Sequence, residues 1–340
     1  MSHKIELPRY VVRGERVFDD VALVAEEISK KKPLIVADKT TYEIAGKIVQ
    51  KKIEGDSALI ESATFNEAEN VEELIREKGY DLAVGVGGGS VLDVTKAAAF
   101  NTSIPFFSIP TAISNDGIAS AGASLFSEGR RKSIQLKVPL AIFADLEIIK
   151  GAPRRLFSAG CGDAISKFTS VKDWKLASEE RGEYYGGYAA ELARLAAEMV
   201  IKNAEEMAKS IETGVHILFE VMVSSGVAMS MANSSRPASG AEHNFSHALD
   251  MIAPEPALHG EQVGIGTIMM SHLHGEDYKI IKNTLKRVGA PTTAEELGID
   301  EEYIIKALVM ANSIRKRYTI LRGGLSEKEA RALAEETEVI

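Results

Sequence analysis

The chain has few of the residues that mark secreted, membrane or nucleic-acid-binding proteins. Cys161 is the only cysteine among 340 residues, so no internal disulfide can form and a reducing interior fits. Lys and Arg number 40 against 49 Asp and Glu, and the net charge of −9 argues against a general nucleic-acid binder. No apolar run reaches the roughly 18 residues of a membrane span, and residues 1–4 begin no apolar leader. We therefore expect a cytoplasmic protein without an integral membrane segment.

The first 150 residues alternate between short apolar runs and helical patterns. The expected strands are 33–37, 57–60, 81–86 and 104–109, and the expected helices are 42–52, 68–78 and 90–100. Thr40 or Thr41 is the expected N-cap of the first of these helices. Continuous apolar strands separated by helices indicate a parallel, Rossmann-like sheet covered on both faces. Residues 119–138 change pattern and predict a hairpin with its turn at 128–131.

Strand patterns stop after about residue 151. The expected helices of this second half are 191–210, 216–232, 262–274 and 303–317. The sequence therefore predicts an α/β domain over 1–150 and an all-α domain over 151–340, with the boundary near 146–152.

Two polar loops follow successive expected strands. The glycine-rich segment 85–93 joins a strand to a helix, where backbone N–H groups and a helix N-terminus favour a phosphate, although a tight turn is the alternative. It matches neither the G-x-G-x-x-G pattern nor the P-loop. Residues 110–117 offer Thr111, Ser114 and Asp116, which would also suit an ordinary capped loop. Loops at the carboxyl ends of neighbouring strands favour a ligand site there.

Three of the seven histidines are clustered in the second half. His243 and His247 are four residues apart, so they share one face of a helix, and His259 follows after prolines that end that helix. Any one of them could be an ordinary core or surface residue, but three together indicate that at least two bind a metal ion. Asp163 is the best upstream carboxylate. The spacing does not fit the zincin motif.

These motifs together resemble one superfamily over nearly the whole chain. Residues 87–93 (GGGSVLD), 110–111 (PT) and 162–166 (GDAIS), with the histidine cluster, are similar to the iron-containing alcohol dehydrogenase, glycerol dehydrogenase and dehydroquinate synthase superfamily. Within it, residues 234–243 (SSRPASGAEH) and 245–250 (FSHALD) resemble the sn-glycerol-1-phosphate dehydrogenases.

The resemblance implies an N-terminal dinucleotide-binding domain and a helical metal- and substrate-binding domain. It further implies reduction of dihydroxyacetone phosphate to sn-glycerol 1-phosphate with NADH or NADPH, a step of archaeal membrane lipid synthesis. Glycerol dehydrogenase and a dehydroquinate synthase-like lyase are the enzymatic alternatives, and a catalytically silent binding protein is the third. We also expect a homo-oligomer.

The resemblance also implies residue roles. Metal ligands would be Asp163, His243 and His259. Substrate contacts would be Asp116, Asp163 and His247, of which Asp116 and His247 would be catalytic. Dinucleotide contacts would be Gly87, Gly88, Gly89, Ser90, Asp93, Thr111, Ser114 and Ser120. Lys167 stands where the iron enzymes have a further histidine, which favours zinc with an open coordination position.

Two further sites are predicted from the residues themselves. Asp38 ends an expected strand, where a carboxylate can accept a hydrogen bond from a ribose 2′-hydroxyl. Arg236 could bind the substrate phosphate bidentately, with the hydroxyls of Ser234, Ser235 and Ser239 completing the pocket. The alternative for Arg236 is a salt bridge at the interface between the two domains.

Overall fold

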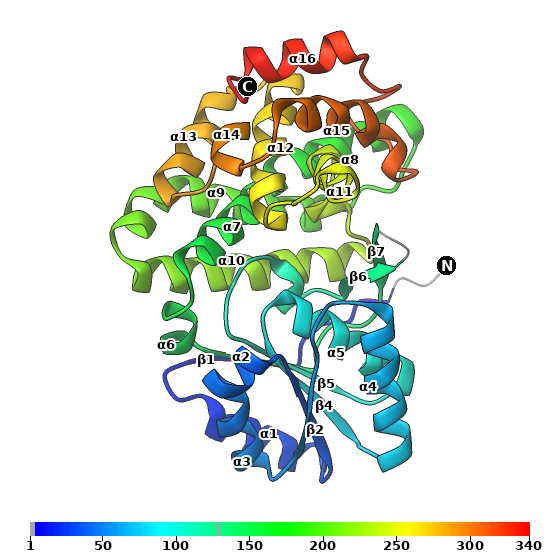
Figure 1. Ribbon diagram of the computed structural model, residues 1–340, viewed down its shortest axis with the longest axis vertical. Helices are drawn as coiled ribbons and strands as arrows, with labels where there is room; N and C mark the ends of the chain where they lie inside the picture. Colours follow the sequence, from blue (N-terminus) through cyan, green and yellow to red (C-terminus); the bar gives the residue numbers. More distant parts are fainter. Residues whose placement is uncertain (1–3, 128–129) are drawn as a thin grey trace. The chain divides into compact units, whose positions relative to one another are not determined.

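The computed structural model describes residues 4–127 and 130–340. Its internal contacts divide the chain into two compact units, Lys4–Pro153 and Arg154–Ile340. Figure 1 shows strands flanked by helices in the first unit and helices throughout the second. Each unit is described by itself.

The first unit contains a six-stranded parallel sheet in the order β1-β8-β5-β4-β2-β3. Its strands are β1 (Tyr10–Gly14), β2 (Pro33–Ala37), β3 (Asp56–Leu59), β4 (Leu82–Gly87), β5 (Phe106–Pro110) and β8 (Ala141–Asp145). The four predicted strands are confirmed within two residues at either end, whereas β1 and β8 were missed. Every residue of β2, β4, β5 and β8 is buried, as expected for a sheet covered on both faces.

Helices cover both faces of this sheet (Figure 1). They are α1 (Phe18–Glu27), α2 (Lys39–Thr41), the π-helical turn η1 (Tyr42–Gly46), α3 (Lys47–Ile53), α4 (Phe65–Lys78), α5 (Gly89–Thr102), the 3₁₀ turn η2 (Asp116–Ile118) and α6 (Leu146–Lys150). On one face, α1 and α3 pack against alternate residues of the central strands, such as Ile35, Val84 and Phe107. This alternation follows from the two-residue period of a strand.

The predicted hairpin is confirmed, but as a separate two-stranded sheet. Strands β6 (Gly122–Ser127) and β7 (Arg130–Gln135) pair in antiparallel fashion. Residues 128–129 of the predicted turn lie outside the described residues, and residues 130–131 belong to β7 and not to the turn. A second correction concerns the helix expected at 42–52, which begins at Lys39. Its N-cap is Asp38, whose carboxylate accepts hydrogen bonds from the free N–H groups of Thr40 and Thr41 in the first turn.

The second unit is entirely helical in its described residues, as predicted. Its elements are α7 (Arg154–Ile165), α8 (Lys167–Arg181), α9 (Gly187–Lys209), α10 (Ile211–Ala232), the 3₁₀ turn η3 (Arg236–Ala238), α11 (Ala241–Ile252), α12 (His259–Leu273), α13 (Tyr278–Val288), α14 (Ala294–Leu297), α15 (Glu301–Ile314) and α16 (Glu327–Glu336). Among the described helices only α10 is long and apolar enough to cross a membrane, and 61% of its most apolar stretch is buried within the structure.

Helices α7 and α12 meet backbone to backbone. A Cβ atom added to Gly260 would lie 1.9 Å from the carbonyl oxygen of Ala159, and one added to Gly162 would lie 2.2 Å from that of Gly260. Both distances are far below van der Waals contact, so only glycine permits this approach. Gly162 precedes Asp163 and Gly260 follows His259, so the contact fixes two predicted metal ligands beside each other.

Replacing Gly260 with alanine should therefore destabilise the second unit. The added methyl group must push α12 away from α7, and overpacking of this kind costs about 1–3 kcal/mol or more in the free energy of unfolding. Urea unfolding of Gly260→Ala measures the loss. Gly187→Ala is the matched control, because its Cβ meets nothing within 4 Å. Equal stability of the two variants would contradict the close contact.

Candidate active site

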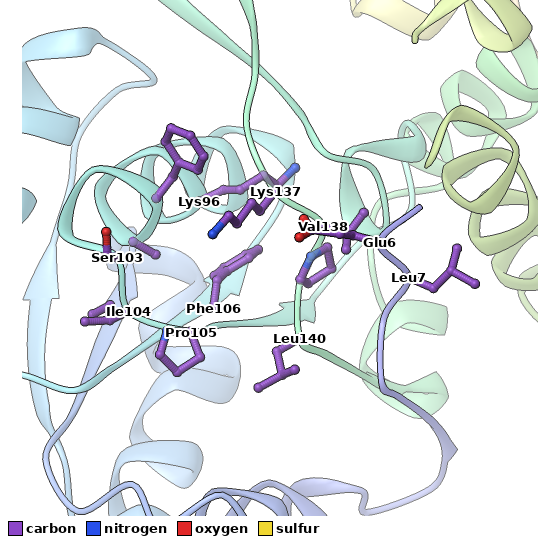
Figure 2. A pocket seen from close by; sticks show the side chains of 13 residues that line it. Glu6, Leu7, Lys96, Ser103, Ile104, Pro105, Phe106, Lys137, Val138 and Leu140 are labelled. Atoms are coloured by element: carbon purple, nitrogen blue, oxygen red, sulfur yellow. The ribbon is translucent and has the colours of Figure 1, made fainter. Parts of the chain in front are cut away.

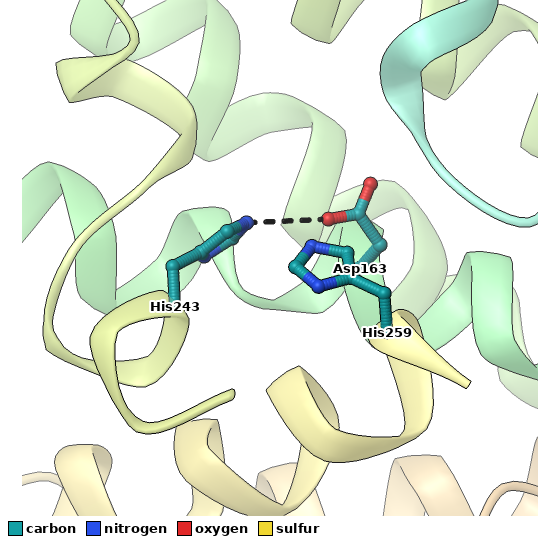
Figure 3. Close-up of side chains that lie close together, drawn as sticks. All are labelled: Asp163, His243 and His259. Carbon is teal, nitrogen blue, oxygen red and sulfur yellow. Dashed lines mark ion pairs between the residues drawn. The ribbon is translucent and has the colours of Figure 1, made fainter. Parts of the chain in front are cut away.

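Three helices bring the predicted metal ligands together. Asp163 comes from α7, His243 from the first turn of α11, and His259 is the first residue of α12. One ligand atom of each side chain lies within 4.8 Å of the others, and His243 Nε2 is 3.6 Å from Asp163 Oδ1 (Figure 3). Asp163 and His243 are buried. Two imidazole nitrogens and one carboxylate oxygen are a donor set for a divalent metal ion with an open position.

Glu242 orients the ring of His243. Its Oε1 lies 2.9 Å from His243 Nδ1, so that nitrogen carries the proton and Nε2 faces Asp163 as a free ligand atom. The fully buried Glu242 carboxylate also accepts hydrogen bonds from Gly240 N at 2.6 Å and Thr169 Oγ at 2.8 Å. The sequence did not predict this contact, because adjacent helical residues ordinarily point in different directions.

His259 is oriented by a second set of hydrogen bonds. Its Nδ1 lies 3.1 Å from Ser246 Oγ, which also accepts a hydrogen bond from Gln262 Nε2 at 3.0 Å. Burial, together with the neighbouring His243, lowers the pKa of His259 to about 3. The ring is therefore neutral near pH 7, which is the form that binds a metal ion.

Lys167 stabilises the charge of Asp163. Its ammonium group is 3.1 Å from Asp163 Oδ1 and donates a hydrogen bond to the Asp163 carbonyl oxygen at 2.8 Å. Burial would raise the pKa of Asp163, but Lys167 and His243 outweigh it and hold that pKa below its usual range. The carboxylate is thus ionised and ready to bind a cation. The neutral imidazole of His259 beside this ionised carboxylate fits the expected ion, and the carboxylates of Asp163 and Glu242 raise the pKa of His243 against the effect of its burial.

His247 lies beside this triad and outside it. Its ring stacks on that of His259 with centroids 5.8 Å apart, and its Nε2 accepts a hydrogen bond from Arg315 Nη2 at 2.6 Å. Burial lowers the pKa of His247 to about 4, against the opposing effect of Asp250. His247 is therefore a neutral imidazole near pH 7, with its proton on Nδ1.

The structure gives Arg236 a salt bridge, but within the second unit and not at a domain interface as its alternative role required. Its guanidinium group forms a bidentate pair with Glu183 and also donates to the Tyr318 carbonyl oxygen at 2.8 Å. The hydroxyl of Ser234 accepts a bond from Arg236 N at 3.2 Å, within the predicted phosphate segment. Since all three guanidinium nitrogens are engaged, the contacts of Arg236 are structural ones. These contacts do not support the prediction that Arg236 binds the substrate phosphate.

The guanidinium groups of Arg315 and Arg317, and not that of Arg236, contact the hydroxyls of two serines that were predicted to bind phosphate. Arg315 Nη1 donates to Ser239 Oγ at 3.2 Å, and Arg317 Nη2 donates to Ser235 Oγ at 2.7 Å. Arg317 also donates to the Ser239 carbonyl oxygen. The sequence analysis missed both arginines, which follow α15, far along the chain from the serines that they contact.

In the first unit, the two predicted dinucleotide loops lie side by side. They leave the neighbouring strands β4 and β5, and Thr111 N donates to the Gly87 carbonyl oxygen at 3.1 Å. A Cβ on Gly89 would lie 2.9 Å from Asn115 Nδ2, so the loops touch, whereas a Cβ on Gly88 would meet nothing within 4 Å. Gly88 therefore leaves room at the N-terminus of α5, where an anion is favoured.

Other residues that were predicted to bind the dinucleotide also form hydrogen bonds within the chain. Asp93 Oδ2 accepts a hydrogen bond from Ser124 N at 2.9 Å, and burial raises the pKa of Asp93. Asp38 Oδ1 accepts the N–H groups of Thr40 and Thr41, both at 2.8 Å. The remaining predicted residues of this unit are placed as follows: Ser90 is exposed, Ser114 and Asp116 are half-buried, and Ser120 is buried with its N–H donated to the Asp116 carbonyl oxygen.

A cavity of about 390 Å³ in the first unit lies away from these loops (Figure 2). Its lining includes Ile104, Phe106 and Leu140, at the amino ends of β5 and β8. Ligands of parallel sheets bind at the carboxyl ends of the strands, so this cavity is not the expected dinucleotide site.

Comparison with known proteins identifies the family of the chain. A family model for iron-containing alcohol dehydrogenases matches residues 12–153. The glycerol-1-phosphate dehydrogenase (NAD(P)+) of Pyrococcus furiosus is 50% identical, over 99% of this chain and 100% of its own. The namesake protein of Methanosarcina acetivorans is 48% identical, over 99% and 96%. The chain belongs to the glycerol-1-phosphate dehydrogenase family.

Solved structures agree on the fold of this family member. A probable glycerol dehydrogenase from Sinorhizobium meliloti has a TM-score of 0.83 at 22% identity, with both chains covered completely. A sulfoacetaldehyde reductase from Bifidobacterium kashiwanohense, in complex with NAD+, has a TM-score of 0.77 at 16% identity over 99% of both chains. These confirm the predicted superfamily fold.

Substitution of Glu242 by glutamine should weaken metal binding. The amide keeps the shape of the carboxylate but removes the charge that fixes and strengthens His243 as a ligand, and loss of such a partner costs about 10- to 100-fold in metal affinity. Competition with a chromophoric chelator measures the change. Glu276→Gln, which alters an ion pair with Lys172, is the control. Equal affinities in the two variants would refute the orienting role of Glu242.

Proposed function

We propose that this chain reduces dihydroxyacetone phosphate to sn-glycerol 1-phosphate with NADH or NADPH, for the backbone of membrane lipids. The observation that carries the proposal is the triad of Asp163, His243 and His259, with neutral His247 beside it. The names of relatives about 50% identical over the full length support this substrate and cofactor.

In this proposal the triad holds a zinc ion and the loops after β4 and β5 hold the dinucleotide. The bound dihydronicotinamide supplies the hydride and the metal ion polarises the ketone. Residues 87–90, Asp93, Thr111, Ser114 and Ser120 bind the dinucleotide, and Asp38 accepts a ribose hydroxyl. The backbone at Gly88 receives the pyrophosphate, because no Cβ blocks its approach.

The side chains around the triad position the substrate and move its proton. His247 contacts the substrate oxygen, and the proton that the alkoxide takes up passes through its imidazole, which, in the tautomer that carries its proton on Nε2, gives up that proton as it accepts another on Nδ1. Asp116 orients a substrate hydroxyl. Asp163 is held ionised by Lys167, so it serves as metal ligand and as substrate contact together. We further propose that the enzyme works in the cytoplasm as a homo-oligomer, which size-exclusion chromatography with light scattering tests.

One assay separates this function from its rivals. Consumption of NADH with dihydroxyacetone phosphate, but slowly with unphosphorylated dihydroxyacetone, supports the proposal. A glycerol dehydrogenase would reduce dihydroxyacetone as readily as its phosphate ester. A dehydroquinate synthase-like lyase would show no net oxidation of NADH.

Removal of the metal should abolish turnover and leave the fold largely intact. Helices other than α7, α11 and α12 also hold the second unit together, so chelation should change circular dichroism little. Activity should return when zinc is added. Full activity in protein shown to contain no metal would contradict the proposed mechanism.

Two histidine variants separate ligation from catalysis. His243→Ala should lose the metal, because it removes one of three ligands. His247→Ala should retain the metal and lose rate, by about 10²- to 10⁴-fold for a group that transfers a proton. Metal content by mass spectrometry, measured beside kcat, distinguishes the two. Loss of metal in His247→Ala would make His247 a ligand instead.

Both NADH and NADPH should support the reaction. The Asp38 carboxylate accepts the 2′-hydroxyl of NADH, and Lys39 and Thr40 beside it soften its repulsion of a 2′-phosphate. Initial rates at saturating concentrations of each cofactor test this expectation. Turnover with only one of the two would contradict it.

A further inference from the structure

Two arginines bring positive charge to the edge of the candidate active site. The guanidinium groups of Arg315 and Arg317 both donate to Ser239, one to its hydroxyl and the other to its carbonyl oxygen. Arg317 also holds Ser235. Both side chains are half-buried, so each keeps a surface that a small ligand can reach.

The two carboxylates that act electrostatically on Arg317, Glu183 and Glu242, are engaged by other groups. Glu183 neutralises Arg236, and Glu242 is engaged by His243, Thr169 and Gly240. Among the described residues, no carboxylate lies within ion-pair distance of Arg317. Burial, with the nearby charges of Arg315 and Arg236, lowers the pKa of Arg317 to about 10. Grouping buried cations is unfavourable unless an anion joins them.

We propose that Arg315 and Arg317, with the hydroxyls of Ser235 and Ser239, bind the phosphate monoester group of the substrate. A planar guanidinium group matches phosphate oxygens with two parallel hydrogen bonds, and two such groups can hold the dianion from different sides. Arg236 stabilises the segment that carries these serines, through its contacts with Glu183 and the Tyr318 carbonyl oxygen. The inference rests on the proposed function and names the residues that select a phosphorylated substrate.

Arg315 connects the proposed phosphate site to the metal triad. Its Nη2 atom donates to His247 Nε2 at 2.6 Å, and the His247 ring stacks on His259. One imidazole therefore separates the guanidinium group from the metal triad. A three-carbon substrate is short enough for its phosphate to lie on the arginines while its carbonyl group lies at the triad. A phosphate that engages Arg315 also draws this guanidinium group from His247 Nε2, which frees that nitrogen for the substrate.

Arg317 is the better residue to test, because no hydrogen bond joins it to a histidine. Zinc-loaded Arg317→Ala should raise both KM for dihydroxyacetone phosphate and the inhibition constant of inorganic phosphate by about 10- to 100-fold, with a smaller change in kcat. Arg317→Lys should raise both constants less, since it keeps the positive charge but loses the planar guanidinium group that forms two parallel hydrogen bonds. Unchanged phosphate inhibition in Arg317→Ala would overturn the inference.

Arg322→Ala is the matched control. This exposed arginine lies in the same segment and pairs with Glu180, so its loss should leave both constants unchanged. An equal effect of the two alanine variants would overturn the site, because it would reflect net charge alone. If circular dichroism shows that Arg317→Ala does not fold, Arg317→Lys tests the site instead. Weaker phosphate binding by Arg317→Lys than by the wild type supports the site, and equal binding refutes it.

Calorimetric titration with inorganic phosphate separates this inference from the proposed function. Phosphate binding that depends on Arg317 supports the site even if the wild-type enzyme reduces no dihydroxyacetone phosphate, in which case the proposed function fails alone. Turnover of dihydroxyacetone phosphate without any Arg317-dependent phosphate binding keeps the function and removes the site.

Discussion

The backbone contact between α7 and α12 is the constraint on which the rest of the second unit depends. Gly162 and Gly260 let the two helices approach until a single methyl group would not fit between them. The neighbouring residues on each helix, Asp163 and His259, are thereby held with their ligand atoms within 4.8 Å of each other. His243 joins them from α11, which contacts another face of α12 through a further glycine, Gly266. The metal site is thus a product of helix packing.

The local part of this arrangement could be predicted from the sequence. Continuous apolar runs identified the central strands, and the spacing of His243 and His247 placed them on one face of a helix. Of the two missed strands, only β1 lacks such a run. β1 alternates between half-buried and exposed residues at the edge of the sheet, and β8 is a short run behind an irregular segment.

Contacts between distant segments could not be predicted in the same way. Arg236 has the charge and position expected of a phosphate ligand, yet Glu183, 53 residues upstream, binds it. Arg315 and Arg317 carry no motif of their own, and their nearness to Ser239 depends on the path of the chain after α15. A basic residue in a sequence shows that a charge is present. Its partner is chosen by tertiary packing.

Asp38 joins helix stability to cofactor choice. Its Oδ1 atom caps the first turn after β2, and in the proposed role the same carboxylate contacts the ribose. A substitution that removes the negative charge to admit a 2′-phosphate must still cap the helix, or it costs about 1 kcal/mol of stability. Asparagine and serine satisfy both demands, whereas alanine and the larger apolar residues do not. The evolutionary routes from one cofactor to the other are therefore narrowed at this position by folding as well as by binding.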